Sequence, residues 1–258
     1  MESKYQAYTP DSNGIIPYSD NDHAIWNILY QQQINLIKEC GSSAYLLGME
    51  KLNLPHDKIP QPKLISRTLY QETGWVVEPV PALIDFNYFY NLLAQKKFPA
   101  ASFIRSKEEL KYLKEPDIFH EIFGHCPMLT NSDFASFVHK VGLFGVNLPK
   151  EYQPMLGRLF WFTVEFGLIQ EDSSLKAYGA GILSSQTETS YSLHSNTPQR
   201  HKLDLIKLLR TPYRYDELQK NYFIIESYNE LYNLVNQDLL ITFNAVKEMG
   251  LLPNLHLC

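Results

Sequence analysis

The chain has 258 residues, 45% of them hydrophobic and 20% charged, and a formal net charge of −5. This composition is typical of a globular protein with a sizeable core, and the negative charge argues against binding to nucleic acid or an anionic membrane, which require a basic face. The first residues lack the apolar stretch of a signal peptide, and no apolar run approaches the roughly 20 residues of a membrane span. Three widely spaced cysteines indicate reduced thiols, so we expect a cytoplasmic protein.

The chain divides into a polar arm and one folded region. Residues 1–21 contain turn signals and are predicted to form an irregular N-terminal arm, whereas residues 22–258 form one domain that includes a C-terminal helix. Apolar periodicity, capping residues and helix stops predict helices over residues 22–40, 44–52, 63–72, 86–94, 134–143, 151–169, 185–193 and 226–249. Short apolar runs predict strands within residues 74–81, 98–104, 174–182, 203–209 and 222–225. The expected fold is mainly α with a few short β-strands.

A cluster of metal-ligand side chains lies between Pro116 and Pro127, in the sequence Pro-Asp-Ile-Phe-His-Glu-Ile-Phe-Gly-His-Cys-Pro. We expect Pro116 to occupy the first position of a helix. His120 and His125 are five residues apart, so on a regular α-helix their side chains would point about 140° apart. They converge if the second histidine lies where the helix ends, since proline disfavours helix in the preceding residue. The zinc-protease motif H-E-x-x-H fails, because Gly124 occupies its second histidine position.

Glu165 is the best candidate for a third ligand. It is the only acid within the apolar stretch 159–169, where a carboxylate is unfavourable unless it is paired or bound to a metal. Two histidines and one carboxylate form the facial triad of non-haem Fe(II) oxygenases, which leaves three positions open. The simpler alternatives are two hydrogen-bonded histidines, and an ion pair between Glu165 and Arg158 or Arg105.

Three sequence blocks resemble one known family. Residues 116–127, Trp-Phe-Thr-Val-Glu-Phe-Gly-Leu at 161–168 and Lys-Ala-Tyr-Gly-Ala-Gly-Ile-Leu-Ser-Ser at 176–185 are similar, in order and spacing, to signature segments of the pterin-dependent aromatic amino acid hydroxylases. Weaker similarity extends from about residue 22 to 235. The chain looks like the catalytic domain of this family, most like its bacterial phenylalanine-hydroxylating branch. The resemblance implies the hydroxylase catalytic fold for residues 22–258.

The resemblance also implies a metal site. His120, His125 and Glu165 match the residues that hold Fe(II). Ser184 matches a serine on the substrate side of the site that orients the first histidine, and such a contact determines which ring nitrogen faces the metal.

A substrate site follows from the same match. Arg105 matches an arginine that binds the substrate carboxylate, a bidentate contact suited to a guanidinium, and Asp117 matches its support. Trp161 matches an aromatic wall of the substrate pocket, and Ser184 lies beside that pocket. Without the match, Arg105 would be interpreted as a surface ion-pair residue and Trp161 as helix core.

Four further residues match the pterin site. Phe89 matches the ring that stacks on the pterin, and Leu83 and Ile84 lie where the family's backbone bonds the pterin edge. Glu121, next to the first histidine, faces the pterin in this family and is not expected to act as a hydrolytic base.

The chain departs from the family at several positions. Leu113 stands where many members have threonine, Phe160 replaces a tyrosine, and Pro99 replaces a histidine of the animal members. Trp161, in place of phenylalanine, disfavours the tryptophan-hydroxylating branch. Ile224, in place of an acid, disfavours the tyrosine-hydroxylating branch, so both positions point to phenylalanine as the substrate.

The expected function is therefore hydroxylation of L-phenylalanine to L-tyrosine, with Fe(II), O₂ and tetrahydrobiopterin or a related tetrahydropterin, through an Fe(IV)=O intermediate. The alternatives are hydroxylation of tryptophan or tyrosine by the same mechanism, a zinc hydrolase, and a non-catalytic metal- or pterin-binding module. We expect no nucleic-acid or membrane partner. An apolar stripe on the last helix is compatible with a monomer or a homodimer.

Overall fold

Helices make up most of the structure, a computed structural model that describes residues 5, 7–110, 113 and 115–253. Its α-helices are α1 (Asp20–Cys40), α2 (Ser43–Leu52), α3 (Pro62–Thr73), α4 (Phe86–Ala94), α5 (Ser132–Gly145), α6 (Gln153–Phe160), α7 (Ala180–Leu183), α8 (Gln186–His194), α9 (Leu205–Arg210), α10 (Tyr228–Leu234) and α11 (Leu239–Met249). Four other turns are the 3-10 helices η1 (Lys107–Glu109) and η3 (Met128–Thr130) and the π-helices η2 (His120–His125) and η4 (Trp161–Glu165). The predicted fold class is confirmed.

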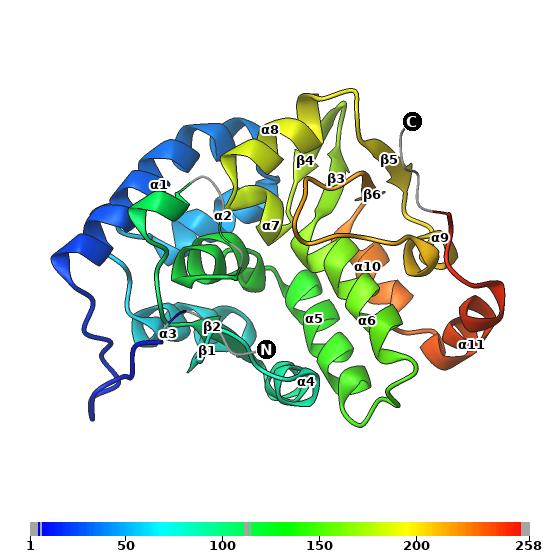
Figure 1. Ribbon diagram of the computed structural model, residues 1–258, viewed down its shortest axis with the longest axis horizontal. Coiled ribbons are helices and arrows are strands. Elements are labelled where there is room, and N and C mark those ends of the chain that lie inside the picture. The colour runs from blue at the N-terminus through cyan, green and yellow to red at the C-terminus, as the bar shows by residue number, and fades with distance from the viewer. Residues whose placement is uncertain (1–4, 6, 111–112, 114, 254–258) are drawn as a thin grey trace.

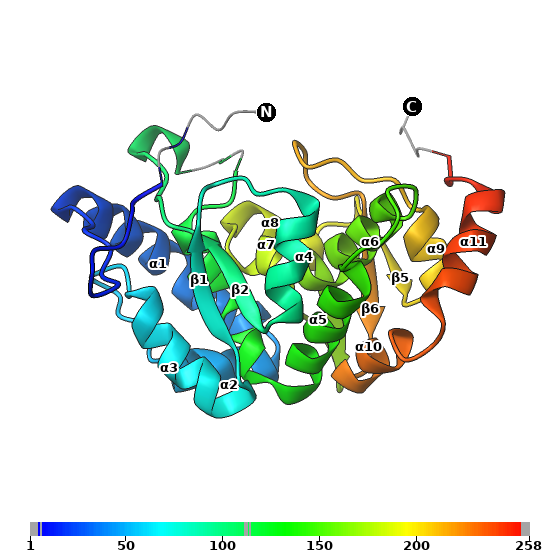
Figure 2. The same ribbon diagram turned by 90° about the horizontal axis from the view of Figure 1, so that it is seen from below.

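Two small sheets lie apart from each other, with α5 between them (Figures 1 and 2). The first is a parallel pair, β1 (Val76–Val80) and β2 (Lys97–Ala101), with Val77 opposite Phe98. The second has the order β4-β3-β6-β5, with bounds Ser174–Ala177, Gly167–Glu171, Asn221–Ile225 and Gln199–Lys202. Its β3–β4 pair is antiparallel, whereas β6 runs parallel to both β3 and β5. Helix α5 packs on α4 on one side and on α10 on the other.

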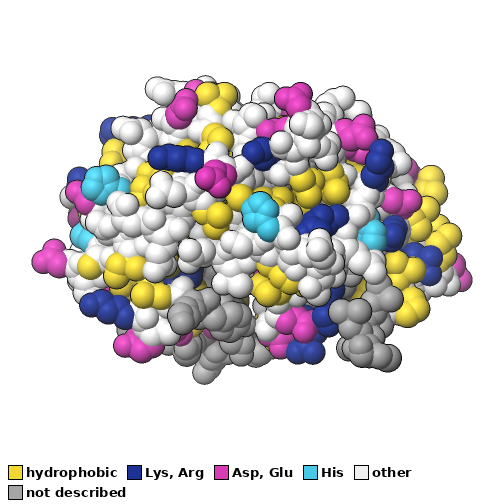
Figure 3. Space-filling view, turned by 90° about the horizontal axis from the view of Figure 1, so that it is seen from above, with side chains coloured by type: hydrophobic (Ala, Val, Ile, Leu, Met, Phe, Trp, Pro, Cys, Tyr) yellow, Lys and Arg dark blue, Asp and Glu magenta, His cyan; other side chains and the backbone are white. Residues whose placement is uncertain are grey.

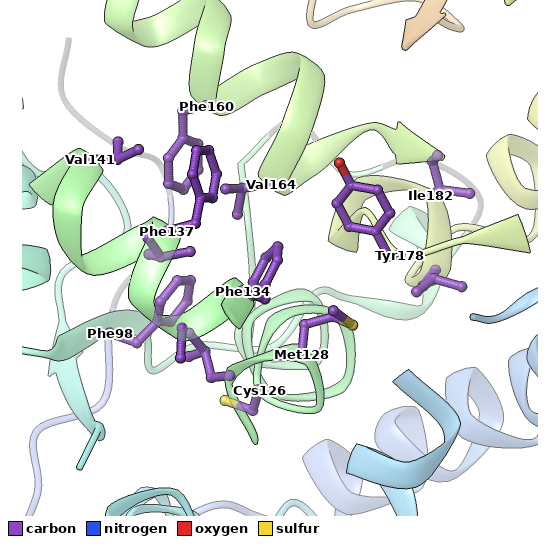
Figure 4. Close-up of a cluster of buried hydrophobic side chains, with 14 of the residues drawn as sticks. Phe98, Cys126, Met128, Phe134, Phe137, Val141, Phe160, Val164, Tyr178 and Ile182 are labelled. Atoms are coloured by element: carbon purple, nitrogen blue, oxygen red, sulfur yellow. The ribbon is translucent and has the colours of Figure 1, made fainter. Parts of the chain in front are cut away.

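One apolar core joins most of these elements (Figure 4). Phe98 of β2, Phe137 and Val141 of α5, Phe160 of α6 and Val164 of η4 all contribute buried side chains to it. Burying an aliphatic or aromatic side chain contributes about 1.5–3 kcal/mol. The π-helix η4 is therefore held from behind by the packed core.

Two predicted elements differ from the structure, and a third is settled by it. Residues 205–210 form helix α9 and not a strand, because the Asp204 carboxylate caps the helix by accepting from the Lys207 backbone N–H at 2.8 Å. The helix predicted over residues 151–169 is α6 followed by η4, and the chain becomes strand β3 at Gly167. The C-terminal helix, which the sequence predicts over residues 226–249 with or without a break, is broken: α10 ends at Leu234, and α11 begins at Leu239 after its cap Asp238.

The N-terminal boundary is also set by a cap. Helix α1 begins at Asp20, before the predicted residue 22, because the Ser19 hydroxyl accepts from the Asp22 backbone N–H and the Asp22 carboxylate accepts from the Ser19 backbone N–H. Among the residues before α1 that the structure describes, 5 and 7–19, none belongs to a strand. Tyr8 reaches the same helix end, donating its hydroxyl to Asp22 at 2.9 Å.

The surface carries both signs of charge. On the face in Figure 3, acidic and basic side chains are interspersed with apolar ones. None of the helices in the described part of the chain has the length and apolar character needed to cross a bilayer.

A glycine allows helices α4 and α5 to approach closely, which gives a first test. A Cβ atom at Gly142 would lie 2.5 Å from the Ala94 nitrogen, whereas one at Gly157 in α6 would meet nothing within 4 Å. We expect Gly142→Ala to lower the free energy of unfolding by about 1–3 kcal/mol through overpacking. Gly157→Ala should raise it by up to about 1 kcal/mol, because alanine favours helix. Urea unfolding measures both, and equal effects of the same sign would contradict the packing account.

Candidate metal and substrate site

The two histidines of the motif lie on the π-helix η2. A π-helix closes between residues i and i+5, so side chains five apart lie close together. The Nε2 atoms of His120 and His125 are 3.1 Å apart. Helix η2 ends at His125, with Cys126 as its C-cap, as we expected, but the two rings converge because of the π spacing, which we did not predict. The expected start at Pro116 was wrong: the helical segment begins after Asp117, whose carboxylate accepts from the His120 backbone N–H at 3.1 Å.

Glu165 reaches the same point from a second π-helix, η4, in which the Phe166 backbone N–H donates to the Trp161 carbonyl at 2.9 Å. Its two carboxylate oxygens lie 3.2 Å from His125 Nε2 and 3.4 Å from His120 Nε2. The alternative pairing with an arginine does not occur. Arg105 contacts Asp117, and Arg158 donates to the Pro154 carbonyl.

These three donor groups fit a metal ion. Ligand atoms bound at about 2.1 Å to one ion and at right angles to each other would lie about 3.0 Å apart. The observed separations among His120, His125 and Glu165 are 3.1, 3.2 and 3.4 Å. Two imidazoles and one carboxylate are a donor set that Fe(II) accepts. The residues present therefore fit a facial triad.

Electrostatics distinguish Glu165 from a second carboxyl group, that of Glu121. His120, Glu121 and His125 also have ligand atoms within 4.8 Å of one another, so Glu121 is a competing ligand. Burial raises the pKa of Glu121 to about 8, and the opposing charge of His120 does not offset it, so this carboxyl group is mostly protonated at neutral pH. Burial also acts to raise the pKa of Glu165, but the two histidines outweigh it and hold that pKa well below the ordinary value. The closer, ionised Glu165 is the better ligand.

Ser184 sets the tautomer of His120. The Ser184 hydroxyl donates its proton to the Ala180 carbonyl at 2.7 Å and lies 2.8 Å from His120 Nδ1. It therefore accepts from Nδ1–H, which leaves the lone pair on Nε2, facing Glu165 and His125. Gly124 permits this contact, because a Cβ atom there would lie 3.0 Å from the Ala180 carbonyl oxygen.

Arg105 and Asp117 form a buried, bidentate ion pair beside the histidines. Arg105 Nε lies 2.7 Å and Nη2 2.9 Å from the Asp117 oxygens, and the Arg105 backbone N–H donates to the same group at 3.0 Å. Burial acts to raise the pKa of Asp117, but the guanidinium charge outweighs it and lowers that pKa. Within the described residues the Nη1 group of Arg105 has no hydrogen-bond partner, so one edge of the guanidinium is available to a ligand.

Trp161 is half-buried at the start of η4, four residues before Glu165. Its ring is stacked on Tyr213, with centroids 4.4 Å apart, and its Nε1–H donates to the Gln219 side chain at 2.9 Å. We did not predict these two partners. Both lie in an irregular loop more than 50 residues away in the sequence, where no periodic pattern or motif identifies them.

The residues matched to a pterin site lie in the loop after β1, on α4 and on η2. Leu83 is exposed and Ile84 half-buried in the loop before α4, and Phe89 lies on α4 with its ring edge-on to Phe160, with centroids 5.3 Å apart. Phe160, one departure from the family pattern, thus packs against the ring expected to face the pterin. The Glu121 carboxyl group accepts from the Ala101 backbone at the end of β2.

Two other residues that differ from the family pattern, Leu113 and Pro99, are at half-buried and buried positions. Leu113 is half-buried and packs against a small apolar cluster of Ala82, Ala101 and Phe103. Pro99 is buried in β2 opposite Glu78. Neither side chain supplies a polar group to the site.

Comparison with known proteins agrees with this geometry. Residues 4–242 match the model of the biopterin-dependent aromatic amino acid hydroxylases. The chain is 47% identical to the phenylalanine-4-hydroxylase of Pseudomonas aeruginosa, over 96% of this chain and 95% of that protein. It superposes on phenylalanine hydroxylase from Legionella pneumophila with a TM-score of 0.94 and 47% identity, covering 96% and 98% of the two chains. The enzyme from Chromobacterium violaceum with bound Fe(III) matches with a TM-score of 0.89 and 37% identity, over 95% and 91% of the chains.

The chain therefore belongs to the biopterin-dependent aromatic amino acid hydroxylase family. The resemblance inferred from the three sequence blocks is confirmed.

The buried ion pair gives a second test. Asp117→Asn leaves the Arg105 guanidinium buried without its counter-charge, and removing one partner of a buried pair costs about 3–5 kcal/mol. We expect the free energy of unfolding, measured in urea at pH 7, to fall by about that amount. The control is Glu226→Gln, which removes an exposed pair with Lys202 and should change stability by less than about 0.5 kcal/mol. Equal effects of the two substitutions would contradict this account.

Proposed function

We propose that this chain hydroxylates L-phenylalanine to L-tyrosine, with Fe(II) held by His120, His125 and Glu165. The observation that carries the proposal is the convergence of these three donor groups within 3.4 Å of each other. When bound, Fe(II) and a tetrahydropterin together activate O₂, and the pterin supplies two electrons. The relatives are named for phenylalanine hydroxylation, so phenylalanine is favoured over tryptophan and tyrosine, as predicted.

The chain's own residues bind and orient the reactants. Arg105 binds the substrate carboxylate through its free edge, and Asp117 fixes the guanidinium plane by its bidentate contact. Because Asp117 also accepts from the His120 backbone, the substrate clamp and the first metal ligand share one support. Trp161 forms a wall of the phenylalanine pocket. Ser184 lies beside this pocket and holds His120 in the tautomer that binds metal.

The pterin site is proposed on the opposite side of the histidines. Phe89 stacks on the pterin ring, and the backbone of Leu83 and Ile84 bonds its edge. Glu121 faces the same ligand, and because it is mostly protonated at neutral pH it can donate a hydrogen bond as well as accept one. The natural cofactor is tetrahydrobiopterin or a related tetrahydropterin.

We further propose that the protein works in the cytoplasm, without nucleic-acid or membrane partners, and that residues 1–21 form an arm on a catalytic domain of residues 22–258. We also propose that it is a monomer or a homodimer. Exposed apolar side chains on and after α11, among them Ile241 and Leu251, are compatible with a second subunit. Light scattering in solution distinguishes the two states, and a larger assembly would contradict both.

The activity itself is tested by one assay. Protein loaded with Fe(II) and supplied with tetrahydropterin, O₂ and L-phenylalanine should form tyrosine, and protein loaded with Zn(II) should not. Absence of tyrosine from folded, iron-loaded protein would contradict the proposal. Hydrolase activity with zinc and without pterin would support the alternative function, that of a zinc hydrolase.

The choice between the two carboxyl groups is tested by a matched pair. Glu165→Ala should lose bound iron and activity together, because only two histidine ligands remain. Glu121→Gln should retain iron, since a neutral amide replaces a mostly protonated carboxyl group. Iron content after dialysis against a mild chelator measures both variants. Retention of iron by Glu165→Ala, with loss from Glu121→Gln, would reverse the assignment.

A further inference from the structure

Three residues hold the Trp161 indole: Tyr213 and Gln219 lie in a distant loop, and Phe166 is the C-cap of η4. Tyr213 stacks on its face at 4.4 Å and 21°, Phe166 lies at 4.7 Å, and Gln219 accepts from Nε1–H at 2.9 Å. An indole nitrogen can only donate, so a half-buried Nε1–H without an acceptor would favour rotation of the ring towards water. The hydrogen bond to Gln219 is thus the directional contact among the three.

Gln219 is itself fixed by both groups of its side-chain amide and by its backbone N–H. It is 4% exposed, and its side-chain Nε2 donates to the Arg214 carbonyl at 2.7 Å and the Glu217 carbonyl at 3.1 Å. Its backbone N–H donates to Glu188 at 3.2 Å. The side-chain amide of Gln219 therefore bonds to two carbonyls of its own loop and joins that loop to Trp161.

Glu188 anchors this loop to the rest of the fold. It lies on α8, is 6% exposed, and one of its oxygens accepts from both the Tyr222 hydroxyl and the Gln219 backbone. Helix α8 follows directly after Ser184, the residue that orients His120. The network therefore connects the segment of the first histidine to the wall at Trp161.

Packing alone does not hold the loop in place. Tyr213 and Gln219, with the core residue Phe162, line a cavity of about 90 Å³, so packing against this part of the loop is incomplete. A segment beside empty space keeps its position through its hydrogen bonds. Removal of these hydrogen bonds should therefore change the orientation of the Trp161 indole.

We propose that Gln219 is a positioning residue for the substrate: it sets the orientation of the Trp161 indole, and Glu188 holds Gln219 in place. This inference rests on the proposed function, in which Trp161 is a wall of the phenylalanine pocket. Loss of the contact allows the wall to turn, which weakens binding of phenylalanine. The metal ligands do not contact Gln219, so the chemical step is largely preserved.

Gln219→Met tests the inference, because methionine has a similar length but accepts no comparable hydrogen bond. The substitution removes three side-chain hydrogen bonds, of which one reaches Trp161. We expect the KM for phenylalanine to rise about three- to tenfold, the loss expected for that one hydrogen bond, with kcat within about twofold of the wild type. If this variant does not fold, Gln219→Asn applies the same test, since it withdraws the amide from Trp161 by one methylene.

A second readout needs neither iron, pterin nor substrate. Trp26 and Trp75 are 0% exposed, so quenching of tryptophan fluorescence by acrylamide reports mainly on Trp161. Quenching should increase in Gln219→Met, and Trp161→Phe should abolish the responsive signal. In Gln219→Met/Trp161→Phe the KM should be no higher than in Trp161→Phe alone, because the two residues act through one contact.

The matched control is Gln61→Met. Gln61 also accepts from one N–H and donates to one carbonyl, both of Ile16, and it has no contact with Trp161. Gln61→Met should leave both the KM for phenylalanine and the acrylamide quenching unchanged. Glu188→Gln keeps an oxygen that can accept from the Gln219 backbone N–H, so this variant should also resemble the wild type. Unchanged KM and quenching in Gln219→Met, with active wild type, would overturn the inference and leave the proposed function standing. If the wild type forms no tyrosine, the proposed function fails and increased quenching alone still supports the orienting contact.

Discussion

A buried carboxylate facing two histidines is the interaction on which the site depends. Glu165 lies among apolar residues, where an unpaired charge is strongly unfavourable, and His120 and His125 are its partners within 3.4 Å. The His125 side chain is 3% exposed and those of His120 and Glu165 are 16% exposed, so all three are largely shielded from bulk water. A divalent cation bound between these donor atoms would be coordinated by all three groups.

The two π-helices explain how the ligands converge. In η2 the spacing is one that a regular α-helix would direct apart, because five residues separate His120 from His125. Trp161 and Glu165 in η4 are four residues apart, a spacing that already places two side chains on one side of a helix. A π-turn is uncommon and is found preferentially at functional sites. Here the wider turns bring metal ligands and the Trp161 side chain into one region.

The Arg105–Asp117 pair extends this arrangement towards the substrate. Asp117 binds the guanidinium with both oxygens and also accepts from the backbone of His120. In the proposed function, the group that binds the substrate carboxylate and the first metal ligand are therefore held by the same carboxylate. The Trp161–Gln219–Glu188 network joins η4 to the loop before β6 and to helix α8.

The sequence by itself determined the fold class, the helix that begins at Phe86 after its cap Asp85, and the candidate ligands, because capping, apolar periodicity and a lone acid in an apolar run are local signals. It did not distinguish strand from helix at residues 205–210, where a short apolar run suits both. Only the tertiary structure decided the π geometry, the tautomer set by Ser184 and the contacts of Tyr213 and Gln219 with Trp161. These depend on packing between segments distant in sequence, and such contacts leave no periodic pattern in the chain.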